Sequence, residues 1–205
     1  QPHKKTQTAD QTVISSYLSL LKKRKVHLGM GAIFVYVGAE VTIGSLLINY
    51  MRREDVLGIA ASDASSLVAI YWGLAMLGRF AGVAALKWFS AEKILILASS
   101  MAIFLVASAI ILSGPLSAAA LISVGFFNSA HFPLIFSTTL RDSDSSAPKI
   151  SALLCMSICG GAIITLVAGS LADIAGLKAA FLVCIICYAY CLYFSYYHRN
   201  QQQQS

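Results

Sequence analysis

Glu40 is a carboxylate in the middle of a long apolar stretch. It is the thirteenth residue of a membrane span expected over residues 28–51, which places it near the centre of a bilayer. A charge at that depth costs about 2.5–3.5 kcal/mol, so such a residue normally faces a partner or a water-filled path. Tyr36 and Gly44 lie one turn away on the same helix face. The spacing predicts a ligand site in which Glu40 is the hydrogen-bond acceptor, Tyr36 supplies an aromatic ring and Gly44 leaves room for the ligand. Alternatively, Glu40 is structural and pairs with Arg79 of another span.

A second polar group, in a later apolar stretch, contains a histidine. His131 shares a helix face with Asn128 and is followed by Phe132 and Pro133. An amide offers both a donor and an acceptor, and aromatic rings stack on the apolar faces of sugars. Proline frees a backbone carbonyl and permits a kink beside a cavity. These residues are candidates for binding a substrate; the alternative is a histidine that packs between helices.

The stretch between these two groups carries an arginine flanked by glycines. Arg79 lies between Gly78 and Gly82, a G-x-x-x-G spacing that lets helices approach closely. Its place toward one end of the span favours a structural or gating role over substrate contact. Tyr71 and Trp72, earlier on the same helix, are either substrate contacts or members of an interfacial aromatic belt.

Other small and sulfur-containing side chains are interpreted as packing. Gly161 and Gly169 form a small-x-x-x-small row with Thr165, which is typical of helix contacts. All five cysteines lie in apolar stretches without an adjacent histidine or carboxylate, so we expect them to behave as small apolar residues. The sequence therefore predicts neither a disulfide nor a metal site.

Motifs for catalysis and for cofactor binding are absent from the sequence. It contains no H-E-x-x-H, G-x-S-x-G or G-x-x-x-x-G-K-[ST] pattern. We therefore expect no catalytic residue, no cofactor and no enzymatic activity. Because there is no ATP-binding motif, any transport would be secondary.

Membrane-spanning helices must position these side chains. Of the 205 residues, 58% are apolar and 12% are charged, against roughly 25% charged in a soluble domain. Apolar windows of about 20 residues suit helices that cross a bilayer. The sequence predicts an all-α, polytopic membrane protein with six spans, at residues 28–51, 66–89, 94–112, 117–140, 150–172 and 177–198. Residues 1–27 are expected to form a linker with a basic run, residues 28–198 the six-helix domain, and residues 199–205 a cytoplasmic tail.

Basic residues are unevenly distributed between the two sides of these spans. If the N-terminus is cytoplasmic, eleven Lys and Arg residues lie inside and three outside, namely Arg52, Arg53 and Lys178. This asymmetry predicts that both termini face the cytoplasm. The basic run at residues 22–25 directly precedes the first span, where anionic headgroups are its natural partner. Despite the net charge of +6, nucleic-acid binding is not expected.

Four stretches, in the same order, resemble the fucose/glucose–galactose permease family of the major facilitator superfamily. They are Y-V-G-A-E-V at 36–41 with I-G-S at 43–45, Y-W-G at 71–73 with G-R-F at 78–80, F-N-S at 127–129 with F-P at 132–133 and I-F-S at 135–137, and G-G-A-I-I at 160–164 with A-D at 172–173. Glutamate at position 40 is closer to the glucose/galactose branch than to the fucose branch. Leu166 stands where the family usually has proline, which brings the bending of that helix into question.

The resemblance implies the C-terminal half, helices seven to twelve, of a twelve-helix sugar permease that works by alternating access in a bacterial inner membrane. The implied partners are a monosaccharide, a coupling proton or sodium ion, the lipid bilayer and an N-terminal six-helix half. The six spans would form two three-helix repeats, 28–112 and 117–198, with sites near the midplane. Two other classes stay open: a transporter of another small solute, and a six-helix fragment or assembly partner without transport.

Overall fold

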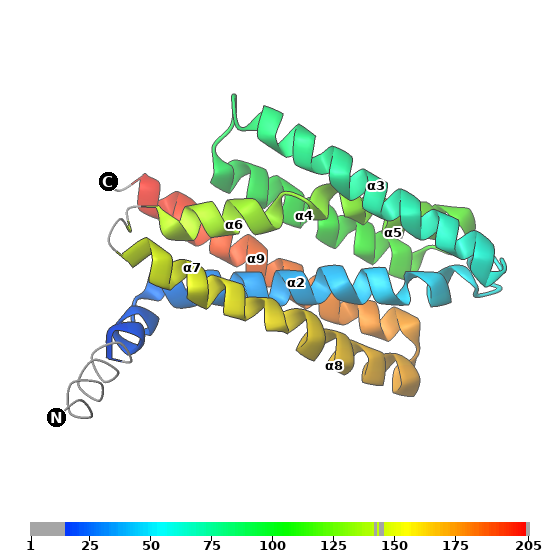
Figure 1. Cartoon of the computed structure of the whole chain (residues 1–205). Helices are drawn as coiled ribbons and strands as arrows, with labels where there is room; N and C mark the ends of the chain where they lie inside the picture. The colour runs from blue at the N-terminus through cyan, green and yellow to red at the C-terminus, as the bar shows by residue number, and fades with distance from the viewer. Residues whose placement is uncertain (1–14, 142, 144–145, 204–205) are drawn as a thin grey trace.

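The structure is a computed structural model that describes residues 15–141, 143 and 146–203. Within these residues the regular elements are helices, and no strand is assigned. The long helices run side by side, and the first and last described residues lie at the same end of the bundle (Figure 1). In chain order the helices are α2 (Arg24–Met51), α3 (Ala61–Ala85), α4 (Ala91–Ile111), α5 (Gly114–Asn128), α6 (His131–Leu140), α7 (Ala147–Met156), the 3-10 helix η2 (Ser157–Cys159), α8 (Gly160–Ala175) and α9 (Leu177–Gln202).

Six segments of the described chain are long and apolar enough to cross a bilayer. They are Arg24–Met51, Ala61–Ala85, Ala91–Ile111, Gly114–Leu140, Ala147–Ala175 and Leu177–Gln202. The expected all-α, six-span architecture is therefore confirmed. The second span was predicted at residues 66–89, but α3 begins five residues earlier and ends at Ala85. Trp88 and Phe89 lie in the turn after α3. The predicted boundary included them because apolarity alone does not distinguish an exposed interfacial aromatic residue from the continuation of a helix.

Both ends of the six-helix region extend beyond the predicted boundaries. Helix α2 starts at Arg24, inside the basic run, and α9 continues to Gln202, so the tail expected from residue 199 is mostly helical. Hydropathy marks only the part of a helix that lies in hydrocarbon, whereas Arg and Gln are good helix formers that extend helices into the headgroup region. Of the linker expected at residues 1–27, residues 15–21 are helical, and residues 1–14 lie outside the described residues.

Two of the six spans are interrupted. The fourth span breaks at Ser129 and Ala130, between α5 and α6. Pro133 stands four residues after Ser129 and cannot donate to its carbonyl, which agrees with the kink expected there. The fifth span is tightened to a 3-10 turn at η2, directly before Gly160, while α8 runs without interruption through Leu166. The interruption of this span therefore lies at η2, and none occurs at Leu166, where the family usually has proline.

Helix α2 lies at the centre of the bundle, where it contacts α8, α9, α6 and α3 (Figure 1). The outer helices pack in the pairs α4 with α9, α3 with α5 and α4 with α5. Helix α3 runs along one edge, and only 17% of its apolar window is buried within the chain. Its outward face carries large apolar side chains, including Met76, Phe80 and Val83. These are suited to contact lipid or another helical unit.

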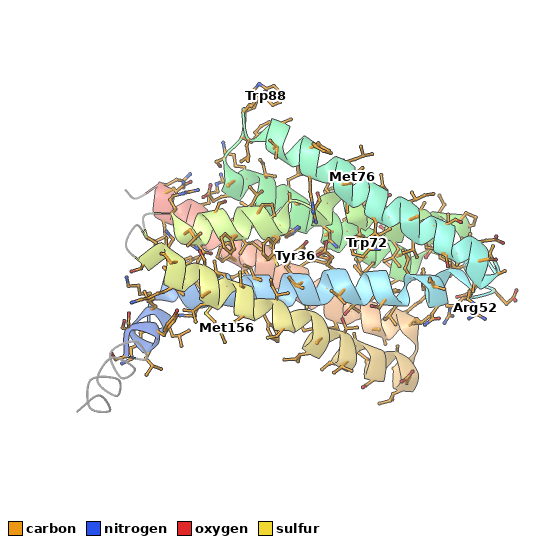
Figure 2. All side chains as sticks on the ribbon, viewed as in Figure 1. Tyr36, Arg52, Trp72, Met76, Trp88 and Met156 are labelled. Atoms are coloured by element: carbon orange, nitrogen blue, oxygen red, sulfur yellow. The ribbon has the colours of Figure 1, made fainter. Side chains whose placement is uncertain are left out.

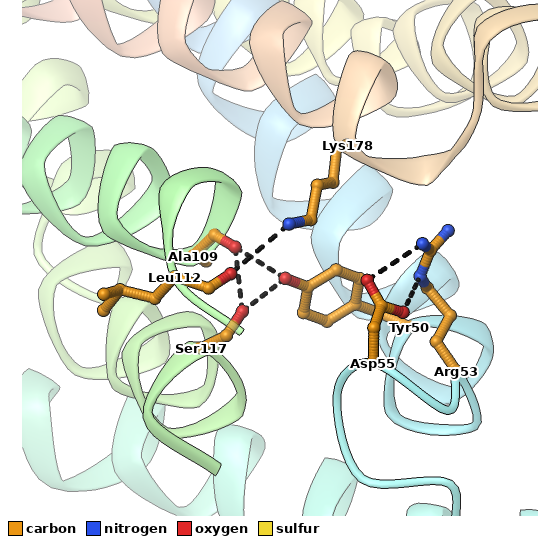
Figure 3. Close-up of polar contacts among 7 residues, drawn as sticks. All are labelled: Tyr50, Arg53, Asp55, Ala109, Leu112, Ser117 and Lys178. Carbon is orange, nitrogen blue, oxygen red and sulfur yellow. Dashed lines mark hydrogen bonds and ion pairs between the residues drawn. The ribbon is translucent and has the colours of Figure 1, made fainter. Parts of the chain in front are cut away.

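The end of the bundle opposite the described termini is held by a polar network (Figure 3). The buried Tyr50 hydroxyl donates to the carbonyl oxygen of Ala109 at 2.6 Å and contacts the hydroxyl of Ser117. Lys178 donates to the carbonyl oxygen of Leu112 at 3.3 Å, which ties the start of α9 to the end of α4. These contacts connect three interhelical turns at one end of the molecule.

An ion pair lies beside this network, in the turn after α2. The Arg53 guanidinium donates to the Asp55 carboxylate at 2.7 Å, and it holds the pKa of that exposed carboxyl below its ordinary value (Figure 3). Because both partners are exposed, the pair contributes little to stability.

Candidate functional site

An open cavity of about 420 Å³ lies midway along the bundle and is lined by helices α2, α3 and α6 and by the η2 turn (Figure 2). Its lining residues are Tyr36, Val37, Glu40, Arg79, Phe132, Pro133 and Ile158. Figure 2 shows Tyr36 at the middle of the bundle, whereas Arg52 lies at one end of α2. The cavity therefore brings together four of the polar and aromatic side chains singled out in the sequence, from helices that are distant along the chain.

Glu40 supplies a carboxylate to this cavity. Its Oε1 atom is buried and has no hydrogen-bond partner within the described residues. Tyr36 and Arg79 line the same cavity as this carboxylate, and the Arg79 guanidinium acts on it through its charge. Arg79 itself is exposed on α3. The carboxylate is thus partly compensated by charge while it keeps one oxygen that can accept a hydrogen bond from a hydroxylated ligand.

His131 does not line the cavity but lies directly behind it. Its ring stacks on Tyr36, with ring centroids 5.2 Å apart and planes 5° apart. Nδ1 faces the carbonyl oxygen of Phe127 at 3.1 Å, and Nε2 lies 2.9 Å from the Ser99 hydroxyl. Since a carbonyl only accepts, Nδ1 carries the proton and Nε2 accepts from Ser99. The imidazole therefore supports the ring of Tyr36 and does not itself line the cavity.

Asn128 lies in a second buried group behind the cavity. Its amide nitrogen donates to the Tyr71 hydroxyl at 3.0 Å, and the Tyr188 hydroxyl donates to its oxygen at 2.6 Å. All three side chains are fully buried. Asn128 and Tyr71, both expected at the substrate, are not among the residues that line the Glu40 cavity; with Tyr188 they join α3, α5 and α9. Buried polar groups in hydrocarbon need such partners.

Trp72 occupies a different place from the one expected of a cavity residue. It is 46% exposed, packs edge-to-face on Tyr71 at 5.1 Å, and lies beside Gly44, where an added Cβ would stand 3.1 Å from its ring. Gly44 was expected to leave room for a ligand next to Glu40. That expectation is wrong, because the indole of Trp72 fills this space.

The predicted small-residue contacts differ from one glycine to the next. A Cβ on Gly78 would collide with the carbonyl oxygen of Phe126, so α3 and α5 approach closely there. A Cβ added to Gly82 would stand an ordinary 3.5 Å from the Cβ of Ala130, and one added to Gly161 would stand 3.1 Å from the Val37 side chain. Gly169 has no neighbour within 4 Å. Within the chain, the row in α8 therefore packs at Gly161 and not at Gly169.

The cysteines are free thiols in the structure. Cys184, Cys187 and Cys191 are buried in α9, and Cys155 and Cys159 are exposed. In the part of the chain that the structure describes, no group of three His, Cys, Asp or Glu residues could hold a metal ion.

The sequence did not predict one ion pair, in which a buried carboxylate meets a partly exposed arginine. Glu92, at the start of α4, is fully buried, and its Oε1 lies 2.8 Å from the Arg141 guanidinium at the end of α6. Glu92 sits next to Lys93 at an expected helix start, a position at which a carboxylate is ordinarily solvated. Only its burial against a distant arginine reveals the contact.

The comparisons with known proteins agree with this architecture. No family model matches the chain. It is 43% identical over 170 residues to a glucose/galactose transporter of Brucella abortus biovar 1 (strain 9-941), covering 82% of this chain and 41% of that protein. It is 35% identical over 192 residues to a putative glucose/galactose transporter of Helicobacter pylori (strain J99 / ATCC 700824), covering 91% of this chain and 47% of that protein.

More distant relatives extend the match to fucose transport and to a solved structure. The L-fucose-proton symporter of Escherichia coli (strain K12) is 30% identical over 183 residues, covering 88% of this chain and 42% of that protein. The crystal structure of the major facilitator superfamily transporter FucP in the outward conformation superposes with a TM-score of 0.85 at 29% identity, covering 90% of this chain and 45% of FucP. The chain thus spans about half the length of the relatives it matches.

Fold and cavity together define a multi-pass helical membrane protein built as half of a major facilitator transporter. The chain belongs to the fucose/glucose–galactose permease family of that superfamily, as its sequence motifs predicted. Its relatives are named as transporters and not as enzymes.

Proposed function

We propose that the chain is the C-terminal six-helix half of a sugar permease, and that the Glu40 cavity is its share of the sugar site. The observation that supports this best is the buried Oε1 of Glu40, which has no hydrogen-bond partner among the described residues; Glu40 lines an open cavity with Tyr36 and Phe132. A carboxylate oxygen accepts hydrogen bonds from sugar hydroxyls, and an aromatic ring covers an apolar sugar face.

The likeness of this chain to glucose/galactose transporters favours those hexoses as substrates, with fucose as the other candidate. Two relatives are named as fucose-proton symporters, which favours a proton over sodium as the coupling ion. In this proposal the protein lies in the cell inner membrane with both termini cytoplasmic. Eleven basic residues would then lie inside and three outside.

The partner in this proposal is a second six-helix half, an N-terminal one, that closes the cavity. The cavity is open, and α3, one of the helices that line it, buries little of its surface within the chain. Alternating access requires two units that rock around a site between them. A single six-helix unit supplies only part of the contacts to the substrate. It also cannot switch access to the site between the two sides of the membrane.

Reconstitution tests the proposal. Proteoliposomes would hold this chain alone, or this chain with the six-helix portion of the Brucella abortus relative that it does not match, and empty vesicles would serve as the control. We expect uptake of labelled glucose or galactose, driven by a proton gradient, only when both halves are present. Concentrative uptake by this chain alone would contradict the half-transporter proposal.

Two other outcomes of the same assay would favour the alternatives. If uptake by the paired halves is competed by solutes other than hexoses and fucose, the chain serves a different small solute. If the two halves bind each other but neither bind nor move any solute, the chain is an assembly partner without transport activity.

A further inference from the structure

A second cavity lies at the end of the bundle that holds the described termini. It has a volume of about 240 Å³ and is separate from the Glu40 cavity. The start of α2, the end of α6 and the end of α9 come together there (Figure 1). We call it the terminal cavity; its lining residues are Lys25, Thr138, Arg141, Tyr197, His198, Gln201 and Gln202.

Two buried side-chain atoms of the terminal cavity have no hydrogen-bond partner within the described chain. They are Oγ1 of Thr138, a residue 1% exposed, and Nε2 of His198, a residue 6% exposed. Polar atoms buried in a membrane protein are ordinarily paired. A hydroxyl and an imidazole from two different helices that both line one cavity therefore indicate a ligand with hydrogen-bonding atoms.

Among the remaining polar groups of the terminal cavity, Lys25 and Arg141 can only donate, whereas Tyr197, Gln201 and Gln202 can donate or accept. The Lys25 ammonium donates to the carbonyl oxygen of Arg141 and so caps the end of α6. The Arg141 guanidinium is held by the buried Glu92 at 2.8 Å, which fixes its position. Ammonium and guanidinium groups cannot accept hydrogen bonds, and the Thr138 hydroxyl and a protonated His198 Nε2 can also donate. The complementary ligand carries several acceptor oxygens.

The charged groups around the terminal cavity indicate the sign of the charge that this ligand carries. Glu92 offsets Arg141, and the carbonyl ends of α6 and α9 add partial negative charge. Against these stand the basic residues Lys22, Lys23 and Arg24, which lead into α2. Arg24 lies over the Tyr197 ring, 4.8 Å from its centroid, which keeps this positive charge beside the cavity. The balance favours an anion.

We propose that the terminal cavity binds a phosphate group. A phosphate offers several strong acceptor oxygens, matching the donors from α2, α6 and α9, and basic pockets between transmembrane helices are suited to phosphorylated headgroups. The group belongs either to an anionic phospholipid or to a soluble phosphate. Its binding bridges three helices that meet at this end, independently of any sugar in the Glu40 cavity.

The test uses the purified full chain in a phosphate-free, non-ionic detergent. In one arm, short-chain phosphatidylglycerol is titrated and bound lipid is counted by native mass spectrometry. In the other arm, inorganic phosphate is titrated at constant ionic strength and the Tm is followed. We expect one saturable site in at least one arm. Saturation by the lipid alone assigns a headgroup site, and saturation by inorganic phosphate assigns a site for soluble phosphate.

Three variants decide whether the terminal cavity is that site. Thr138→Val removes an unpaired buried hydroxyl, so it keeps the fold, and Lys25→Gln removes a donor; each should weaken phosphate binding about tenfold or more. Lys23→Gln removes one charge from the same basic run but does not line the cavity, and it should change affinity less than threefold. Equal losses in all three variants, unchanged affinity in Thr138→Val and Lys25→Gln, or no saturable binding in either arm would overturn the proposal.

Discussion

The ring of Tyr36 lies parallel to the imidazole of His131, 5.2 Å from it between ring centroids. Tyr36 lines the open cavity, whereas His131 is fully buried and is held by Ser99 of α4. The stack therefore connects the surface that would meet a ligand to a polar group fixed inside the bundle. Precise placement of a binding residue depends on such support from behind.

Removing the Ser99 hydroxyl should loosen this support. Ser99→Ala leaves Nε2 of His131 without its donor, so we expect the free energy of unfolding to fall by about 0.6–1.7 kcal/mol, the range for hydrogen bonds between transmembrane helices. Thermal melting in detergent measures the effect. Ser100→Ala, at an exposed neighbouring position, is the matched control and should leave the Tm unchanged. Equal Tm values for the two variants would show that Ser99 does not hold the imidazole.

Glu40→Gln should weaken sugar binding by the assembled two-half transporter. The substitution keeps the shape and removes one charged acceptor, which is worth about 1.5–3 kcal/mol, or roughly tenfold to a hundredfold in affinity. Calorimetry gives the affinity, and a melting curve of the same sample gives the stability. Glu54→Gln, an exposed carboxylate in the turn after α2, is the control. If Glu40→Gln lowers the Tm but leaves every sugar affinity intact, Glu40 is structural.

Two glycines of α8 should respond in opposite ways to alanine. A Cβ on Gly160 would collide with the backbone carbonyl of Phe34 in α2, whereas Gly169 has nothing within 4 Å. We expect Gly160→Ala to cost about 1–3 kcal/mol through overpacking. Gly169→Ala should be neutral or slightly stabilising, because alanine favours a helix. Melting curves of both variants check this, and a larger loss in Gly169→Ala would show that this glycine faces a contact outside the chain.

Cysteine labelling tests the proposed orientation. In a background in which the five native cysteines are replaced, single cysteines are placed at the exposed positions Lys23, Ala60 and Asn200. A membrane-impermeant maleimide added to intact cells should label position 60 only, since the basic residues predict cytoplasmic termini. Lysed cells, in which all three positions should react, provide the control. Labelling of positions 23 and 200 in intact cells, with protection at 60, would invert the topology.

Several features of this protein follow from the sequence alone. Apolar windows of spanning length determine the six membrane segments, because no other arrangement satisfies backbone polar groups in lipid. The fourth span breaks where Pro133 removes a donor to the preceding turn. Family motifs at residues 36–45 and 127–137 indicated relatives that the comparisons also found. Local rules suffice for the spans and for the break, since each of these depends on residues within one segment.

Only the tertiary structure decided which polar side chains meet. Helical periodicity places Glu40 and Tyr36 on one face, but it does not tell which helix that face meets. The bundle puts Arg79 and Phe132 in the same cavity, while it turns Asn128 inward between two tyrosines and fills the space beside Gly44 with Trp72.

The Glu92–Arg141 pair shows the same limit, since its partners are far apart in sequence and each resembles an ordinary helix-end charge. The rotation of a helix about its axis depends on packing along its whole length. That packing, and not local spacing, selects which polar residues line a cavity and which are buried among other helices.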